Sequence, residues 1–219
     1  MIQPAKAFIF DLNGTMINDM HYHAQAWFEV LTQNFGDRFS WDQVAREMYG
    51  KNPEVLARLF GPNHFSEAEI VRLSNNKETR YQELYKPQLN GLPGLIPFLE
   101  KAHAAGIKMG IGSAAIIANI QFVVEGLQIT PFFQSIVGAE NVEESKPHPE
   151  TFLKVAAELQ VAPEDCLVFE DAPKGVEAAF NAGMKCMVIT TMHEKEEFDV
   201  YANVIGFAKD YRSLIPLLP

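Results

Sequence analysis

Polar and charged side chains stand at the ends of three apolar, strand-like segments of this sequence. Asp11 ends an Ala-Phe-Ile-Phe run, Ser113 ends a Gly-Ile-Gly run, and the pair Glu170 and Asp171 ends a Leu-Val-Phe run. A buried strand has no packing need for such groups. Because the carboxyl ends of parallel strands lie along one edge of a sheet, these side chains are expected to meet there. They would form a pocket rich in carboxylates.

Lys146 is the candidate for the positive charge that such a pocket lacks. It lies in a Glu-Ser-Lys-Pro-His-Pro segment, on a loop that leads to a further helix at the same edge. Each position also has a purely structural interpretation. Asp11 could end a strand and begin a turn, and Ser113 could cap a helix. Lys146 could be a solvated surface lysine, and the acidic pair could be a turn favoured by a helix dipole.

The elements expected to position these residues alternate between short buried strands and helices. Continuous apolar runs are typical of parallel strands covered on both faces. The predicted strands are residues 7–10, 135–137, 166–169 and 185–189, with a further strand and turn over residues 108–113. The predicted helices are 95–105, 115–127, 149–159 and 173–182. With right-handed crossovers, this spacing predicts an α/β fold with a Rossmann-like, doubly wound parallel sheet.

Residues 21–85 carry helical signals throughout. Two capping-box patterns mark helix starts there, Ser40 with Gln43 and Ser66 with Glu69. A run of helices after a single strand is not how a doubly wound sheet continues. We therefore expect an inserted helical cap domain, residues 18–89, and a sheet domain made of residues 1–17 and 90–219.

The composition is that of an ordinary globular protein, with 47% hydrophobic and 21% charged residues. A net charge of −10 argues against a broad binding surface for nucleic acid or anionic membranes. No apolar stretch approaches the roughly 20 residues that cross a bilayer. Cys166 and Cys186 lie in apolar runs and are expected to be core thiols in a reducing compartment. We therefore expect a cytoplasmic monomer that binds neither nucleic acid nor membrane.

The segment Asp-Leu-Asn-Gly-Thr at residues 11–15 resembles the D-x-D-G-T signature of haloacid dehalogenase-like (HAD) phosphohydrolases. In that family the first Asp is the nucleophile that takes up the phosphoryl group, which is the role implied for Asp11. The second Asp is the general acid and base, and Asn13 stands in its place. An amide can hydrogen-bond but cannot deliver and recover a proton near neutral pH.

The other polar strand ends resemble the remaining HAD motifs in order and spacing. The resemblance implies that Ser113 hydrogen-bonds the transferring phosphoryl group and that Lys146 neutralises charge on the nucleophile and the phosphate. It also implies a Mg²⁺ site, whose ligands would be Asp11, the backbone carbonyl of Asn13, Glu170 and Asp171. Hard oxygen ligands suit this ion.

The helical segment resembles the cap of the β-phosphoglucomutase-like branch. The resemblance implies substrate contacts at His23, Gly50, Lys51, Lys77 and Ala114. Each cap position also has a structural alternative. His23 could simply lie on an amphipathic helix, Gly50 could form a turn, and Lys51 and Lys77 could be solvated lysines. Pro53 stands where the mutase carries an Arg. A mutase must hold two phosphates at once, so the absence of this cationic side chain favours a simple phosphatase.

Together these resemblances imply a Mg²⁺-dependent phosphatase that hydrolyses small phosphate esters, with sugar phosphates as the expected class. The reaction would pass through an aspartyl-phosphate on Asp11. Asn13 at the acid/base position implies an inactivating Asp→Asn change. Two alternatives stay open: a β-phosphoglucomutase-like phosphotransferase, and a catalytically silent protein that binds a phosphate ligand.

Overall fold

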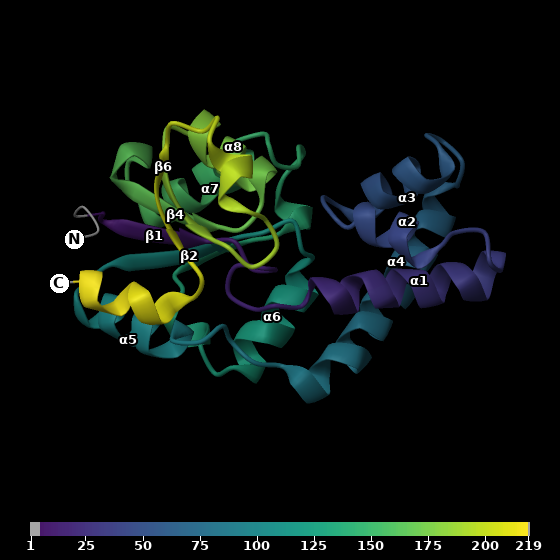
Figure 1. Cartoon of the computed structure of the whole chain (residues 1–219), viewed down its shortest axis with the longest axis horizontal. Coiled ribbons are helices and arrows are strands. Elements are labelled where there is room, and N and C mark those ends of the chain that lie inside the picture. Colours follow the sequence, from purple (N-terminus) through teal and green to yellow (C-terminus); the bar gives the residue numbers. More distant parts are fainter. Residues whose placement is uncertain (1–4, 219) are drawn as a thin grey trace. The chain divides into compact units, whose positions relative to one another are not determined.

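In the computed structural model, which describes residues 5–218, six parallel strands form one sheet in the order β3-β2-β1-β4-β5-β6 (Figure 1). The strands are β1 (Ala7–Phe10), β2 (Lys108–Gly112), β3 (Ser135–Val137), β4 (Cys166–Glu170), β5 (Lys185–Ile189) and β6 (Val204–Ala208). The chain winds outward from β1 in both directions, which is the order of a Rossmann-like, doubly wound sheet. The predicted fold class is confirmed.

The structure corrects the sequence prediction at two strands. β6 was not predicted, because this edge strand is only partly buried and contains Gly206, which weakens its strand pattern. β4 is one residue longer than expected, because Glu170 still pairs with Val188 of β5. Glu170 therefore ends the strand itself, and Asp171 is the first residue after it.

Four helices flank the sheet in the described part of the sheet-forming unit: α5 (Leu95–Ala104), α6 (Ile117–Gly126), α7 (Glu150–Leu159) and α8 (Pro173–Asn181). All four were predicted, with ends that differ by one or two residues. Figure 1 shows α7 and α8 over one face of the sheet and α5 and α6 over the other. Short 3₁₀ helices fill several connections: η1 (Lys86–Gln88), η2 (Thr130–Phe132), η3 (Ala139–Asn141), η4 (Pro163–Asp165), η5 (Lys195–Phe198), η6 (Tyr211–Ser213) and η7 (Ile215–Leu217).

β1 is buried on both faces, since its side chains alternate between two apolar layers. Phe8 and Phe10 pack against Phe98 of α5. Ala7 and Ile9 belong to the core on the other side, under α7 and α8. This double burial explains the continuous apolar run that precedes Asp11.

The chain separates into two compact units, one made of residues 5–18 and 90–218 and the other of Asp19–Leu89. The second unit is helical, with α1 (Met20–Phe35), α2 (Trp41–Arg46), α3 (Asn52–Phe60) and α4 (Glu67–Tyr85). Both predicted capping boxes are confirmed at the starts of α2 and α4. The core of this unit contains Trp27, Leu31, Val55 and Leu73.

Two expectations from composition can be compared with the structure. Cys166 and Cys186 are buried and carry free thiols, as predicted for core residues. Within residues 5–218, none of the helices combines the length and the apolar character needed to cross a membrane.

Candidate active site

Three buried carboxylates meet at the carboxyl ends of β1 and β4. Asp11, Glu170 and Asp171, hereafter the acidic cluster, each place one oxygen within 4.8 Å of the others. The parallel register explains the meeting, because Phe10 pairs with Phe169 and the next residues of both strands therefore emerge side by side. The side chains were predicted to meet at this edge, and they do.

Lys146 points its ammonium into the acidic cluster. Nζ donates to Asp11 Oδ1 at 2.6 Å and to Glu170 Oε1 at 2.9 Å. The Lys146 side chain is only 9% exposed and lies over the ring of Phe152. The alternative of a solvated surface lysine is therefore wrong. The ammonium thus contacts two of the three carboxyl groups, and one positive charge cannot balance the cluster when all three are ionised.

Burial of the acidic cluster makes ionisation of its carboxyls costly. Burial raises the pKa of Asp11 to about 7, although the Lys146 ammonium acts in the opposite direction. Burial, followed by the charges of Glu170 and Asp11, also raises the pKa of Asp171. For Lys146, burial disfavours the charged form, but the two facing carboxylates outweigh it and raise the pKa. A divalent cation would favour the ionised carboxylates, so the donor set fits a hard cation such as Mg²⁺.

The loop after β1 carries two further residues that shape the acidic cluster. Thr15 Oγ1 lies 3.2 Å from both Asp11 Oδ2 and Asp171 Oδ1. A hydroxyl has one hydrogen, so it donates to one of these carboxylates at a time. Gly14 has a φ of 80°, and a Cβ there would lie 2.1 Å from Asp171 Oδ2. Glycine is therefore required where the loop passes the carboxylate.

Ser113 follows β2 and faces the same loop. Its hydroxyl lies 3.5 Å from Asn13 Oδ1 and accepts a hydrogen bond from the Ala115 amide at 3.1 Å. α6 begins at Ile117 with Ile116 as its N-cap, so the helix-capping alternative for Ser113 is wrong. Ala114 lies beside Ser113 in the loop between β2 and α6. The structure thus brings Asn13, Ser113 and Ala114 to the sheet edge that carries the acidic cluster.

Glu170 combines a structural contact with its place in the cluster. Its Oε2 accepts hydrogen bonds from the amides of Asp171 and Ala172 at 2.8 Å, just before α8 begins. The structural interpretation of the acidic pair, a turn before a helix, therefore accounts for Oε2 of Glu170 only. The other oxygen faces Lys146.

The predicted residues of the helical unit fall into two groups. His23 and Lys77 form the first: His23 Nδ1 lies 2.7 Å from Lys77 Nζ, and His23 Nε2 lies 3.3 Å from Asp19 Oδ2. Lys77 is only 4% exposed, so the solvated alternative is wrong for this lysine. Burial lowers the pKa of both side chains.

Gly50 and Lys51 form the second group, in the loop before α3. Gly50 has a φ of 74°, and the Lys51 amide donates to Glu54 Oε2 at 3.1 Å. Asn52 and Glu78 connect this loop to the first group. Asn52 Nδ2 donates to Glu78 Oε1 at 2.6 Å, and the same oxygen accepts from Lys77 at 3.0 Å.

Residues 8–189 match the family described as haloacid dehalogenase-like hydrolase. The chain belongs to this family. Within it, the chain is 33% identical to the β-phosphoglucomutase of Bacillus subtilis, over 82% of this chain and 80% of that protein. It is 32% identical to hexitol phosphatase A of Escherichia coli, over 84% of this chain and 82% of that protein.

A solved structure agrees with this assignment. The crystal structure of β-phosphoglucomutase from Clostridium difficile matches with a TM-score of 0.81 and 29% identity, over 92% of this chain and 90% of that one. The predicted HAD family is confirmed. The chain is a HAD hydrolase similar to sugar phosphatases and phosphoglucomutases, and its acidic cluster could hold a metal ion.

Thr15 and Glu78 are functional candidates that were not predicted from the sequence. Thr15 belongs to the first HAD motif, and its place directly after Gly14 is a signal that could have identified it. Glu78 follows Lys77 in the sequence, but nothing local indicates that it also reaches Asn52.

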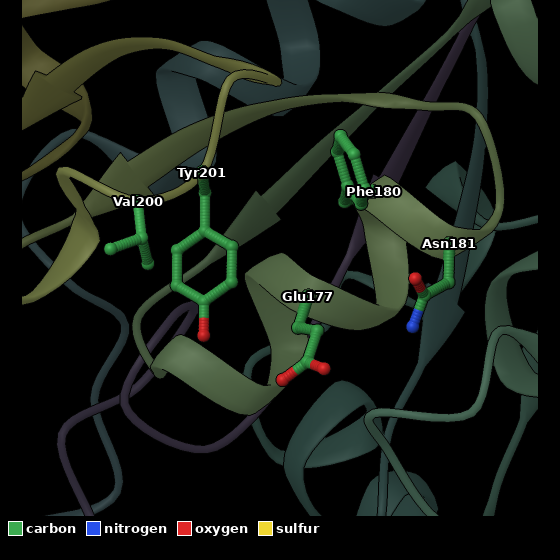
Figure 2. A pocket seen from close by; sticks show the side chains of 5 residues that line it. All are labelled: Glu177, Phe180, Asn181, Val200 and Tyr201. Atoms are coloured by element: carbon green, nitrogen blue, oxygen red, sulfur yellow. The ribbon is translucent and has the colours of Figure 1, made fainter.

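A hollow elsewhere in the sheet-forming unit contains none of the predicted residues. It is lined by Glu177, Phe180, Asn181, Val200 and Tyr201 (Figure 2). The lining residues on α8 come from the later part of that helix, whereas the acidic cluster precedes its first residue. The hollow is therefore not part of the candidate active site.

Proposed function

We propose that this HAD hydrolase has the site of a Mg²⁺-dependent phosphatase for small phosphate esters, with sugar phosphates as its substrate class. The single observation that carries the proposal is the buried contact of Lys146 with Asp11, beside two further carboxylates. Asp11, the backbone carbonyl of Asn13, Glu170 and Asp171 would hold the metal. When bound, the ion would neutralise charge on the transferring phosphoryl group.

Asp11 acts as the nucleophile. A carboxylate oxygen of Asp11 forms a bond to phosphorus as the bond from phosphorus to the ester oxygen breaks, and water later hydrolyses the aspartyl-phosphate. The Lys146 ammonium stabilises negative charge that spreads over the phosphoryl oxygens. Ser113 donates a hydrogen bond to one of these oxygens. In the helical unit, Gly50 and Lys51 belong to a substrate-specificity loop. Lys77 contacts the substrate, and His23 helps to orient the group at the acid/base position.

Asn13 limits the reaction. The leaving oxygen needs a proton and the attacking water must lose one, but an amide can do neither near neutral pH. General acid and base catalysis contributes roughly 10²–10⁴-fold. We therefore propose that this chain binds its metal and phosphate ligands but turns over slowly.

The Asn13→Asp variant tests the proposal on a panel of phosphate esters. We expect its turnover of the best ester to exceed that of the parent by at least about a hundredfold. Asn18→Asp, an exposed substitution five residues away, is the matched control and should leave turnover unchanged. If Asn13→Asp is no faster than the parent on any ester, the acid/base role of position 13 is wrong.

Calorimetry tests the metal site without using activity. The parent should bind Mg²⁺, and Asp171→Ala should abolish binding, whereas Asp165→Ala should not, because Asp165 pairs with Lys6 outside the acidic cluster. Undiminished binding by Asp171→Ala would remove Asp171 from the site.

A phosphotransferase is the second candidate function, favoured by the similarity to β-phosphoglucomutase of Bacillus subtilis. A requirement for a bisphosphorylated hexose would identify it. The remaining alternative is a catalytically silent protein that binds a phosphate ligand. Such a protein would bind phosphate ligands tightly, and its Asn13→Asp variant would still show no turnover.

A further inference from the structure

Two hydroxyl groups from the last third of the chain hold the backbone of the loop after β1. Thr191 Oγ1 donates to the carbonyl of Gly14 at 2.5 Å, and Tyr211 Oη donates to the carbonyl of Thr15 at 3.1 Å. These donors lie 177 and 196 residues further along the sequence. We call Thr191 Oγ1 and Tyr211 Oη the hydroxyl pair.

The hydroxyl pair completes the bonding of a tight loop. Inside the loop, the Gly14 amide donates to the Ile17 carbonyl and the Met16 amide donates to the Leu12 carbonyl, both at 2.8 Å. These bonds use the amides of the loop. The carbonyls of Gly14 and Thr15 accept hydrogen bonds from the hydroxyl pair. Two consecutive peptide groups are thus held from outside the loop.

Tyr211 is itself held firmly. Its ring is fully buried and packs near Phe10, Phe98 and Phe169. Its amide donates to the Pro93 carbonyl at 3.0 Å. Burial, followed by the charges of Asp11 and Asp171, keeps the pKa of Tyr211 well above its usual value, so the phenol keeps its hydrogen. A rigid phenol can therefore fix the carbonyl that it contacts.

The backbone of Thr191 is also fixed by a hydrogen bond. It lies two residues after the end of β5, and its amide donates to the carbonyl of Ile189 at 3.0 Å. The hydroxyl therefore extends from the edge of the sheet toward the loop. A valine has the same shape as threonine but lacks the hydroxyl, so Thr191→Val removes the contact with little change in volume.

We propose that Tyr211 and Thr191 are positioning residues for the acidic cluster. Their hydroxyls fix the peptide groups of Gly14 and Thr15, which set the Thr15 hydroxyl between Asp11 and Asp171. The same loop carries the backbone carbonyl of Asn13. The expected effect on Mg²⁺ affinity rests on the proposed metal site and function. The expected effect on the conformation of the loop after β1 does not.

Amide hydrogen exchange tests the loop without any metal. In Tyr211→Phe and in Thr191→Val, the amides of Gly14 and Met16 should exchange about tenfold faster than in the parent, since each variant leaves a buried carbonyl without its donor. Thr191→Ser, which keeps a hydroxyl, should restore slow exchange. The matched controls are Tyr201→Phe, at the hollow of Figure 2, and Thr190→Val, and both should leave exchange in the loop unchanged.

Calorimetry then measures Mg²⁺ affinity in the same variants. We expect Tyr211→Phe and Thr191→Val to bind Mg²⁺ about tenfold more weakly than the parent, with the controls unchanged. Unchanged exchange in the loop would overturn the proposal. Faster exchange in Tyr211→Phe and Thr191→Val with undiminished Mg²⁺ affinity would also overturn it. The same holds if these variants only lower the melting temperature, because that result indicates a purely structural role. A parent that binds no Mg²⁺ would count against the proposed function, while the exchange rates would still decide the positioning role.

Discussion

The ammonium of Lys146 lies 2.6 Å from the carboxylate of Asp11, and both side chains are about nine-tenths buried. Asp11 follows the first strand and Lys146 lies 135 residues later, so the contact joins distant parts of the chain. In such a place each charge depends on the other, because water is not available to replace a lost partner.

Removing the Lys146 ammonium should strongly destabilise the protein. Lys146→Met keeps an apolar stem but leaves Asp11 and Glu170 facing each other, and breaking a buried pair in this way costs about 3–5 kcal/mol. Urea unfolding in the absence of metal measures the loss. Lys6→Met is the control, because Lys6 pairs with Asp165 at an exposed site and should barely change the free energy of unfolding. Equal effects of the two substitutions would contradict the prediction.

Without metal, ionisation of Asp11 should lower stability as the pH rises. Folding raises the pKa of Asp11 from 3.8 to about 7, chiefly because the carboxyl is buried. Below about pH 4 this group is protonated in both states and contributes nothing, and above about pH 7 the cost of its buried charge is complete. The parent should therefore lose at least about 1 kcal/mol relative to Asp11→Asn between those limits.

Urea unfolding in EDTA across this pH range measures that difference. Saturating Mg²⁺ should reduce it in the parent, since a bound cation favours the ionised carboxylate. A difference that stays constant with pH in EDTA would show that the burial of Asp11 does not govern its ionisation.

An alanine at Gly175 should displace Glu170. A Cβ at this position of α8 would lie 1.7 Å from Glu170 Oε1, so the carboxylate would have to leave its contacts with Lys146 and the two amides. We expect a loss of at least about 2 kcal/mol in unfolding free energy. Gly206→Ala is the control, because its nearest neighbour is the flexible end of Met187 at 3.1 Å. A Gly175→Ala protein as stable as Gly206→Ala would show that Glu170 moves freely.

Lys51→Ala should change the preference among phosphate esters. The loop that carries Lys51 has a defined shape, because Arg58 donates to the carbonyls of Glu47 and Tyr49 and stacks on the Tyr49 ring. If the loop contacts substrate, kcat/KM should fall unequally across a panel of esters, measured with Asn13→Asp present to restore turnover. Lys86→Ala, an exposed lysine of the same unit, should leave the ranking unchanged. An unchanged ranking with Lys51→Ala would make the loop a simple turn.

Much of the candidate site could be predicted because its residues mark strand ends. The apolar run before Asp11 reflects a strand buried on both faces, and the run before Glu170 reflects its parallel neighbour. Once two such strands are parallel, their carboxyl ends must lie together. β6 could not be predicted in this way, because it is a partly exposed edge strand and such a strand leaves little apolar pattern in the sequence.

Local periodicity and short motifs in the sequence are enough to predict the family, the strand and helix pattern, and the edge of the sheet at which the polar groups gather. The contacts between individual atoms could not be predicted in this way. The burial of Lys146 and Lys77, the shared hydrogen bond of Thr15, and the contacts of Thr191 and Tyr211 with the loop after β1 all join residues far apart in the chain. Such contacts depend on how whole elements pack, and packing leaves no local periodic signal in the sequence.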